Sequence, residues 1–273
     1  MIDKFFYARK EGLIMPLTND SKSLSEERYS KYAQGYVSSQ SHAKGYDLDR
    51  LVEISQPQPD WEELDIATGG GHTALKLAPF VKSVVASDLT EKMLRAAEGH
   101  IRAQGVENII FRQADAEDLP FENGSFDLVT CRIAPHHFPD VQKFVGEAVR
   151  VLKAGGIFIV QDHVLPENKE ASRYVDGYEK FRDPSHNRAF TRTEWTGMLE
   201  LAGLMVFYTE EIAKRHNLVQ WAERQDHGPE MIAELMEMIN NFPEKARDWL
   251  QPQDWDTDAA SFVNHHILIA GKK

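Results

Sequence analysis

A chain of 273 residues is long enough for one large α/β domain or two small ones, and it can bury a full apolar core without a metal or a disulfide. Its net charge of −12 disfavours binding to nucleic-acid phosphates or to anionic membranes. The single cysteine, Cys131, cannot form an intramolecular disulfide, and no apolar run approaches the ~18 residues of a membrane span. The segment after Met1 also lacks a secretory pattern, so we expect a cytoplasmic protein without stable membrane association.

Residues 1–30 carry little hydrophobic pattern and are expected to form a mobile N-terminal arm. Either Met1 or Met15 could be the first residue of the protein. A single domain is expected from 31 to 273.

This domain begins with a pattern that alternates helices and short apolar strands. A helix expected over 31–55 ends before Pro57, because proline cannot continue a helix. Thr90 is placed to cap a later helix, and Gly155-Gly156 is expected to stop another. The expected strands are 64–67, 83–87, 108–112, 126–131 and 157–161, and the helices between them are 73–80, 90–97 and 141–152. Repeated units of this kind predict a parallel sheet with helices on both faces.

The last third of the chain is less regular. Thr191 and Glu194 match a capping box at the start of a helix. Strands are expected at 204–208 and 263–270, with a mostly helical insertion over 211–261 between them. Because long connections at the ligand-binding edge of a sheet are often lids, we expect this insertion to cover the acceptor pocket.

Three consecutive glycines, Gly69 to Gly71, join the first strand to its helix. Glycines let the backbone approach a ligand closely, and the helix behind them offers unpaired N–H groups. Asp88 ends the second strand 17 residues after Gly71, where a carboxylate can accept both hydroxyls of a ribose. This arrangement predicts a nucleoside site at the carboxyl edge of the sheet.

Two kinds of nucleotide fit this site. Residues 69–74 match the dinucleotide fingerprint G-x-G-x-x-A, which keeps a nicotinamide-dependent oxidoreductase as an alternative. Asp65, however, would repel a pyrophosphate and could hold the ammonium group of an amino acid. Asp115 and the N–H of Ala116 could bind the edge of an adenine. Together these groups favour S-adenosylmethionine.

The ordered motifs LDIATGGGHTAL, VVASDLT, QADAEDLPFENGSFDLVTCRIAPHHF and EAVRVLKAGGIFIV resemble those of class I S-adenosylmethionine-dependent methyltransferases of the small-molecule type, related to the ubiquinone/menaquinone-biosynthesis enzymes. The resemblance covers Tyr32 to Gln161, and Ala67 replaces the first glycine usual in the family. YVSSQSHAKG, CRIAPHHF and FRDPSHNR indicate a closer likeness to a group of bacterial methyltransferases without an assigned substrate.

The resemblance implies a Rossmann-like, seven-stranded, mostly parallel sheet whose last strand is antiparallel. It also implies the cofactor S-adenosylmethionine, a small-molecule acceptor and the product S-adenosylhomocysteine. The residues that it places around the cofactor are Tyr36, His42, Asp65, Ala67, Thr68, Gly69, Gly71, Asp88, Leu89, Asp115, Ala116, Arg132 and Ile133.

Acceptor-side candidates follow the fourth and fifth strands. His136 and His137 are candidate catalytic residues, because an imidazole can take a proton from an acceptor at neutral pH. The candidate substrate-binding residues are Asp162, His163, Arg182 and His186. No third ligand stands near the histidine pair, so no metal site is expected. A protein that binds S-adenosylmethionine without catalysis is a further alternative.

Overall fold

The strands form one sheet in the order β3-β2-β1-β4-β5-β8-β7, with the short strand β6 paired to β5. The structure is a computed structural model that describes residues 22–29, 45–255 and 257–273. The strands are β1 (Glu62–Ile66), β2 (Ser83–Asp88), β3 (Ile109–Gln113), β4 (Phe126–Arg132), β5 (Leu152–Leu165), β6 (Phe190–Thr191), β7 (Met205–Asn217) and β8 (Ser261–Lys272). β1 to β5 are parallel, whereas β8 runs antiparallel to both β5 and β7. The expected mostly parallel sheet with an antiparallel last strand is confirmed.

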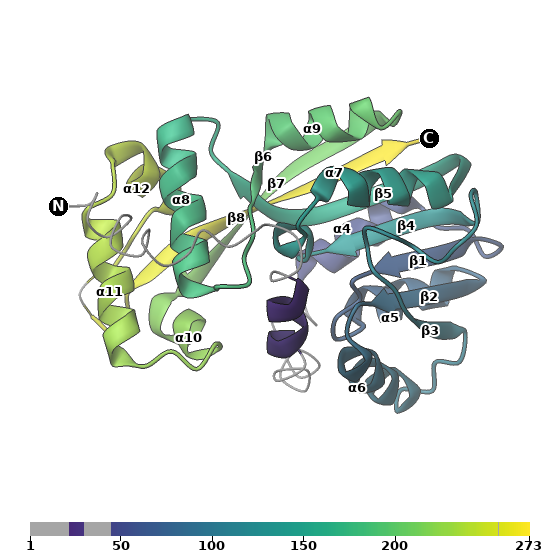
Figure 1. The fold of residues 1–273 in the computed structure, drawn as a ribbon, viewed down its shortest axis with the longest axis horizontal. Coiled ribbons are helices and arrows are strands. Elements are labelled where there is room, and N and C mark those ends of the chain that lie inside the picture. The colour runs from purple at the N-terminus through teal and green to yellow at the C-terminus, as the bar shows by residue number, and fades with distance from the viewer. Residues whose placement is uncertain (1–21, 30–44, 256) are drawn as a thin grey trace.

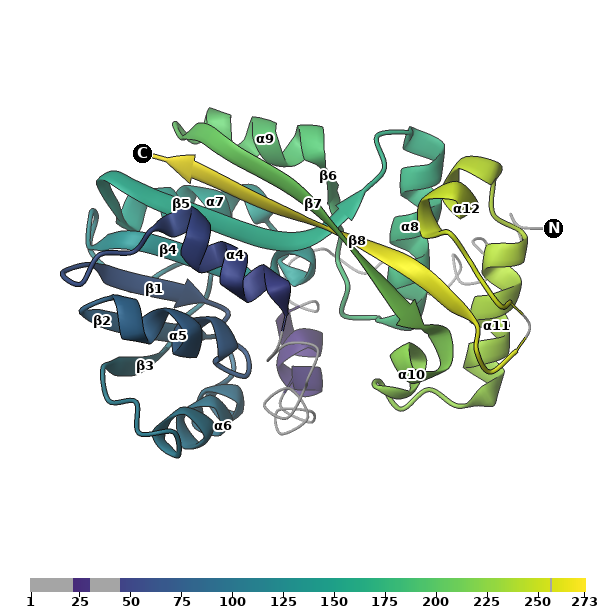
Figure 2. The ribbon, with the colours of Figure 1, turned by 180° about the vertical axis from the view of Figure 1, so that it is seen from behind.

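Helices cover both faces of this sheet. α4 (Tyr46–Ser55) and α5 (His72–Leu77) lie over one face, and α7 (Val141–Val151) and α9 (Arg192–Leu201) over the other (Figures 1 and 2). Phe144 of α7 and Trp195 of α9 pack on the sheet in the largest apolar cluster. α6 (Glu91–Arg102) packs beside α5 over β2 and β3. The short 3-10 helices are η1 (Ala78–Phe80) and η2 (Pro135–His137).

A helical cluster lies beyond the carboxyl ends of the parallel strands. It consists of α8 (Lys169–Arg182), α10 (Leu218–Glu223), α11 (Pro229–Asn240) and α12 (Glu244–Leu250). Its apolar interior includes Tyr178, Trp221 and Phe262. Figures 1 and 2 show the cluster on the side toward which the arrow of β1 points, with the segment 22–29 between the cluster and β1.

Three local expectations need correction. Gly155 does not stop a helix, because α7 ends at Val151 and the glycine lies inside β5, with φ +81° at an irregularity in its pairing with β4. The residues 211–217 are not helical, because β7 pairs with β8 without interruption as far as Asn217 and Ser261. Thr90 precedes α6 but makes no side-chain cap; its own backbone N–H donates to Asp88. The capping box of Thr191 and Glu194 is present as expected.

Candidate active site

A cleft that opens to solvent lies where the loops after β1, β2, β3 and β4 meet the segment 22–29. Ligands of open α/β sheets bind at this carboxyl edge. The expected cofactor residues that line the cleft are Ala67, Thr68, Gly69, Asp88, Leu89, Asp115, Ala116, Arg132 and Ile133. Tyr36 and His42 lie outside the described residues.

The glycine-rich loop after β1 follows a tightly constrained path. Ala67 and Gly69 have φ values of 54° and 55°, in the left-handed region that favours glycine. Gly71, with φ 80°, starts α5, and a Cβ atom there would lie 2.7 Å from Cδ1 of Ile101. Gly71 is therefore required by packing against α6, whereas Gly69 and Ala67 face the cleft. Ile133, another residue with positive φ (55°), also lines the cleft, so strained backbone lies on two of its walls.

Asp88 is held by the backbone around it. Its Oδ2 accepts a hydrogen bond from the N–H of Gly69 at 3.1 Å, and its Oδ1 accepts one from the N–H of Thr90 at 2.9 Å. Burial raises the pKa of this carboxyl to about 6, although the same backbone hydrogen bonds oppose the shift. A fixed carboxylate at the end of β2 is well suited to accept the hydroxyl groups of a ribose.

Asp115 forms the next wall of the cleft. Its Oδ1 accepts a hydrogen bond from the N–H of Glu117, and Nζ of Lys22 lies 2.6 Å from its Oδ2. Lys22 also lies 2.8 Å from Glu117. The residues 22–29, which were expected to belong to a mobile arm, therefore form a helix that lines the cleft.

Asp65 does not line the cleft. It is 1% exposed, and its two oxygens accept the hydroxyl groups of Thr68 (2.6 Å) and Thr130 (3.0 Å). Burial raises its pKa to about 6. Asp65 is turned into the sheet beneath the loop. This geometry does not support the expectation that its carboxylate holds an ammonium group. It also does not support the argument that Asp65 would repel a pyrophosphate.

Arg132 belongs to a buried ion cluster beside the cleft. Its Nη1 lies 2.7 Å from Asp47 of α4, and Lys214 of β7 lies 3.2 Å from the same carboxylate. Burial opposes the charged form of Asp47, but the two cations outweigh it and lower its pKa to about 2. This cluster ties α4 and β7 to the end of β4.

The two adjacent histidines have different surroundings. His137 lines the cleft; its Nδ1 lies 3.0 Å from the carbonyl oxygen of Ser185, and its Nε2 is hydrogen bonded to the hydroxyl of Tyr29. His136 does not line the cleft and is bound by Asp162. Burial lowers the pKa of both imidazoles, so both are neutral near pH 7.

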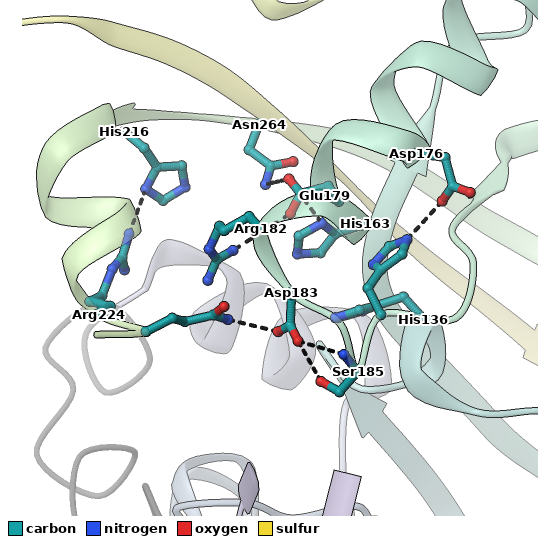
Figure 3. Close-up of polar contacts among 12 residues, drawn as sticks. His136, His163, Asp176, Glu179, Arg182, Asp183, Ser185, His216, Arg224 and Asn264 are labelled. Carbon is teal, nitrogen blue, oxygen red and sulfur yellow. Dashed lines mark hydrogen bonds and ion pairs between the residues drawn. The ribbon is translucent and has the colours of Figure 1, made fainter. Parts of the chain in front are cut away.

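The four expected acceptor-binding residues pair with protein side chains, and Figure 3 shows two of them, His163 and Arg182, beside Glu179. His163 and Arg182 meet at Glu179, at 3.8 and 3.6 Å. His186 is 2% exposed and pairs with Asp176 at 2.7 Å, while Asp162 is fully buried against His136. These four residues therefore pair with protein groups at three places, at Glu179, Asp176 and His136.

Several residues of this site were not foreseen. Lys22 and Tyr29 lie in a stretch that reads as polar surface, and Asp183 lies in FRDPSHNR, from which only Arg182 and His186 were expected to take part in the site. Their contacts depend on the fold, which brings 22–29 and the loop after α8 to the same edge.

Among the described residues, no group of three or more His, Cys, Asp or Glu side chains is arranged to hold a metal ion, and no helix is long and apolar enough to cross a membrane.

The sheet order, the glycine-rich loop and the carboxylates after β2 and β3 define a class I S-adenosylmethionine-dependent methyltransferase, and this chain belongs to that family. A family model described as a methyltransferase domain matches residues 64–160. Membership of this family decides against the nicotinamide-dependent oxidoreductase.

The uncharacterised methyltransferase YcgJ of Bacillus subtilis is 35% identical over 253 residues, which cover 91% of this chain and 99% of the relative. A solved methyltransferase structure from Bacillus halodurans is 39% identical, with a TM-score of 0.80 over 84% of this chain and 99% of that one. The ubiquinone/menaquinone biosynthesis C-methyltransferase UbiE of Pseudomonas entomophila is 36% identical over 131 residues, 46% of this chain and 51% of the relative.

Proposed function

We propose that the protein transfers the methyl group of S-adenosylmethionine to a small-molecule acceptor and releases S-adenosylhomocysteine. The observation that carries this proposal is that one cleft is lined both by the cofactor-type residues Asp88 and Asp115 and by the imidazole of His137.

The single cysteine of the protein favours a reducing compartment, and we therefore propose that the protein lies in the cytoplasm.

The residues of the cleft fit this cofactor. Asp88, fixed by two backbone N–H groups, would take the ribose hydroxyls, and Asp115 with the N–H of Ala116 would take the adenine edge. Leu89 would pack on the adenine, and the loop from Ala67 to Gly69 would lie along the methionine part. The residues Arg132 and Ile133 would close the pocket from β4.

When bound, S-adenosylmethionine supplies a methyl group already activated as a sulfonium, so the protein mainly needs to align the acceptor and exclude water. A base is needed if the acceptor starts protonated. His137 has the right environment for this role, because it is neutral and one of its nitrogens faces the cleft. His136, bound by Asp162, would support the loop that presents His137.

The helical cluster is proposed to cover the acceptor side of the cleft. The side chains of Arg28 and Gln225 are hydrogen bonded, and His227 lies 2.6 Å from the carbonyl oxygen of Arg182, so the loop after α10 lies against both the segment 22–29 and α8. His163 and Arg182, which meet at Glu179, would contact the acceptor from this side.

The test is incubation of the protein with S-adenosylmethionine carrying an isotope-labelled methyl group and a cell metabolite extract. A labelled small molecule in the extract, identified by mass spectrometry, would give both the acceptor and the methylated atom. Label that enters only the protein or nucleic-acid fraction would overturn the small-molecule acceptor. A heat-inactivated sample provides the control.

A further inference from the structure

We infer that Asp183, acting through Ser185, is a positioning residue that holds His137 in one tautomer and stabilises its protonated form, so that Nε2 is kept for a hydroxyl group of the acceptor. This inference rests on the proposed function, since it gives His137 the role of base in methyl transfer.

The tautomer follows from the partners of the ring. The carbonyl oxygen of Ser185, 3.0 Å from Nδ1, can only accept a hydrogen bond, so Nδ1 carries the hydrogen. Nε2 is then an acceptor, and the hydroxyl of Tyr29 donates to it at the wall of the cleft. Nε2 therefore binds the phenolic hydroxyl of Tyr29 in this structure. A methyl acceptor with an ionisable O–H group would offer Nε2 the same kind of donor.

The position of the Ser185 carbonyl is fixed by Asp183. Oδ1 of Asp183 accepts hydrogen bonds from the N–H of Ser185 at 2.9 Å and from its hydroxyl at 2.5 Å, while Oδ2 accepts one from Gln225 at 2.7 Å. The N–H groups of Asn187 and Arg188 both donate to the carbonyl of His136, which ties this turn to the histidine loop. Figure 3 shows Ser185 hydrogen bonded to the buried carboxylate of Asp183. The carbonyl oxygen of the same serine contacts the ring of His137.

The same carboxylate provides the charge that a protonated His137 needs. Burial opposes ionisation of Asp183, but His137, Ser185, Arg28 and Arg182 keep its pKa well below the ordinary range. The other charged or titratable groups that face His137 are Tyr29, His136, Asp162 and His186. Asp162 is engaged by His136 and His186 by Asp176, so Asp183 is the carboxylate joined to His137 through a hydrogen-bonded residue.

The proton and electron balance is simple. The acceptor O–H bond breaks, its proton passes to Nε2, and the acceptor oxygen forms a bond to the methyl carbon. The electron pair of the broken C–S bond stays on sulfur. Asp183 remains ionised throughout and orients the base, as the third member of a nucleophile–base–carboxylate arrangement does.

Imidazole ¹⁵N and ¹³C NMR of the full chain tests this inference without a known acceptor. The His137 signals are assigned by their loss in His137→Gln. We expect the Nδ1–H tautomer at pH 7.5, and we expect Asp183→Asn, which retains an oxygen for Ser185, to lower the pKa of His137 by about one unit. The matched control is Asp176→Asn, a carboxylate that pairs with His186 instead, and it should leave the His137 pKa within about 0.3 units of the parent value.

An Nε2–H tautomer in the parent protein would overturn the inference even if Asp183→Asn does not fold. Equal pKa values of His137 in the two Asn variants would overturn it as well. Calorimetric binding of S-adenosylhomocysteine to the parent protein is measured in parallel. If the parent protein does not bind S-adenosylhomocysteine, the proposed function is contradicted. The tautomer of His137 and the difference between its pKa values in the two Asn variants test only the role of Asp183.

Discussion

The carboxylate of Asp162 holds His136 at two points: Oδ2 accepts from the backbone N–H at 2.7 Å, and Oδ1 lies 2.6 Å from Nδ1. The side chains of Asp162, His136 and His137 are all buried, but of the three only His137 lines the cleft. Two adjacent imidazoles on one short helix therefore have separate surroundings, one inside the protein and one at the wall of the site. The predictions for their variants differ accordingly.

His137→Ala should lower single-turnover methyl transfer to a hydroxyl acceptor by roughly 10²–10⁴-fold, the usual range for a positioned base. The affinity for S-adenosylhomocysteine should barely change, because the ring faces the acceptor. His136→Ala serves as the comparison. It leaves Asp162 without its imidazole partner, so we expect a loss of roughly 1–3 kcal/mol in unfolding free energy and a smaller loss of turnover. Full activity in both variants would show that the reaction proceeds by proximity alone or takes its base from elsewhere.

Asp88→Ala should weaken binding of S-adenosylhomocysteine by about 1.5–3 kcal/mol, because a charge-assisted pair of hydrogen bonds to the ribose is lost. Isothermal titration calorimetry measures the change, and NAD should give no binding heat in the parent protein. Glu91→Ala, which removes an exposed carboxylate three residues along the chain, is the control and should bind normally. An unchanged affinity in Asp88→Ala would remove this residue from the ribose site.

Glu63 and Asp65 share the hydroxyl of Thr130, at 2.7 and 3.0 Å, and one hydroxyl hydrogen cannot serve both carboxylates. Burial first, and then the charge of Asp65, raise the pKa of Glu63 well above 4.5. A carboxyl whose pKa is raised by folding binds more protons in the native state, so its contribution to stability falls as pH rises from the unfolded pKa through the folded one.

Glu63→Gln keeps an oxygen for Thr130 and removes the buried charge. We therefore expect the variant to exceed the parent by roughly 1–3 kcal/mol in unfolding free energy at pH 8 and to match it near pH 4, as measured with urea. Glu62→Gln, which changes a partly exposed neighbour paired with Lys82, is the control and should not exceed the parent in unfolding free energy at pH 8. A Glu63→Gln protein that is less stable than the parent at pH 8 would contradict the raised pKa.

Gly71→Ala should destabilise the protein by roughly 1–3 kcal/mol, since the residue has φ 80° and the added Cβ would lie 2.7 Å from Ile101. Gly99→Ala is a sensitive control, because this glycine lies inside α6 with no atom within 4 Å of the added Cβ. It should gain about 0.5–1 kcal/mol from helix propensity. Thermal unfolding measures both changes in stability. A Gly71→Ala protein as stable as the parent would contradict the predicted strain at this residue.

The parallel core was predictable because each of its strands is expected from a short apolar run that alternates with expected helices. This alternation is typical of a parallel sheet with helices on both faces. The walls of the cleft at Asp88 and Asp115 could be located for the same reason, since Asp88 ends β2 and Asp115 lies in the loop after β3. The local pattern failed where a long-range pairing decided the structure. Gly155 is typical of a helix end, yet it lies inside β5 at the irregularity beside β4, and its N–H donates to the carbonyl oxygen of Lys273. Lys22 and Tyr29 reach the cleft, and Asp183 reaches the turn beside His137, only through contacts between segments far apart in the chain.

The insertion that carries α10, α11 and α12 leaves and re-enters the sheet at Asn217 and Ser261, which are paired neighbours in the ladder of β7 and β8. A connection whose two ends are already held side by side can change its length and sequence with little entropic cost to the sheet. Its replacement would need to offer an apolar surface to the residues packed in the helical cluster from outside the insertion, among them Tyr178 and Val175 of α8 and Phe262 of β8. Within this architecture, therefore, the part of the enzyme that we propose to cover the acceptor can be exchanged by evolution or by design while the loops that line the cleft, which lie on other strands, remain as they are.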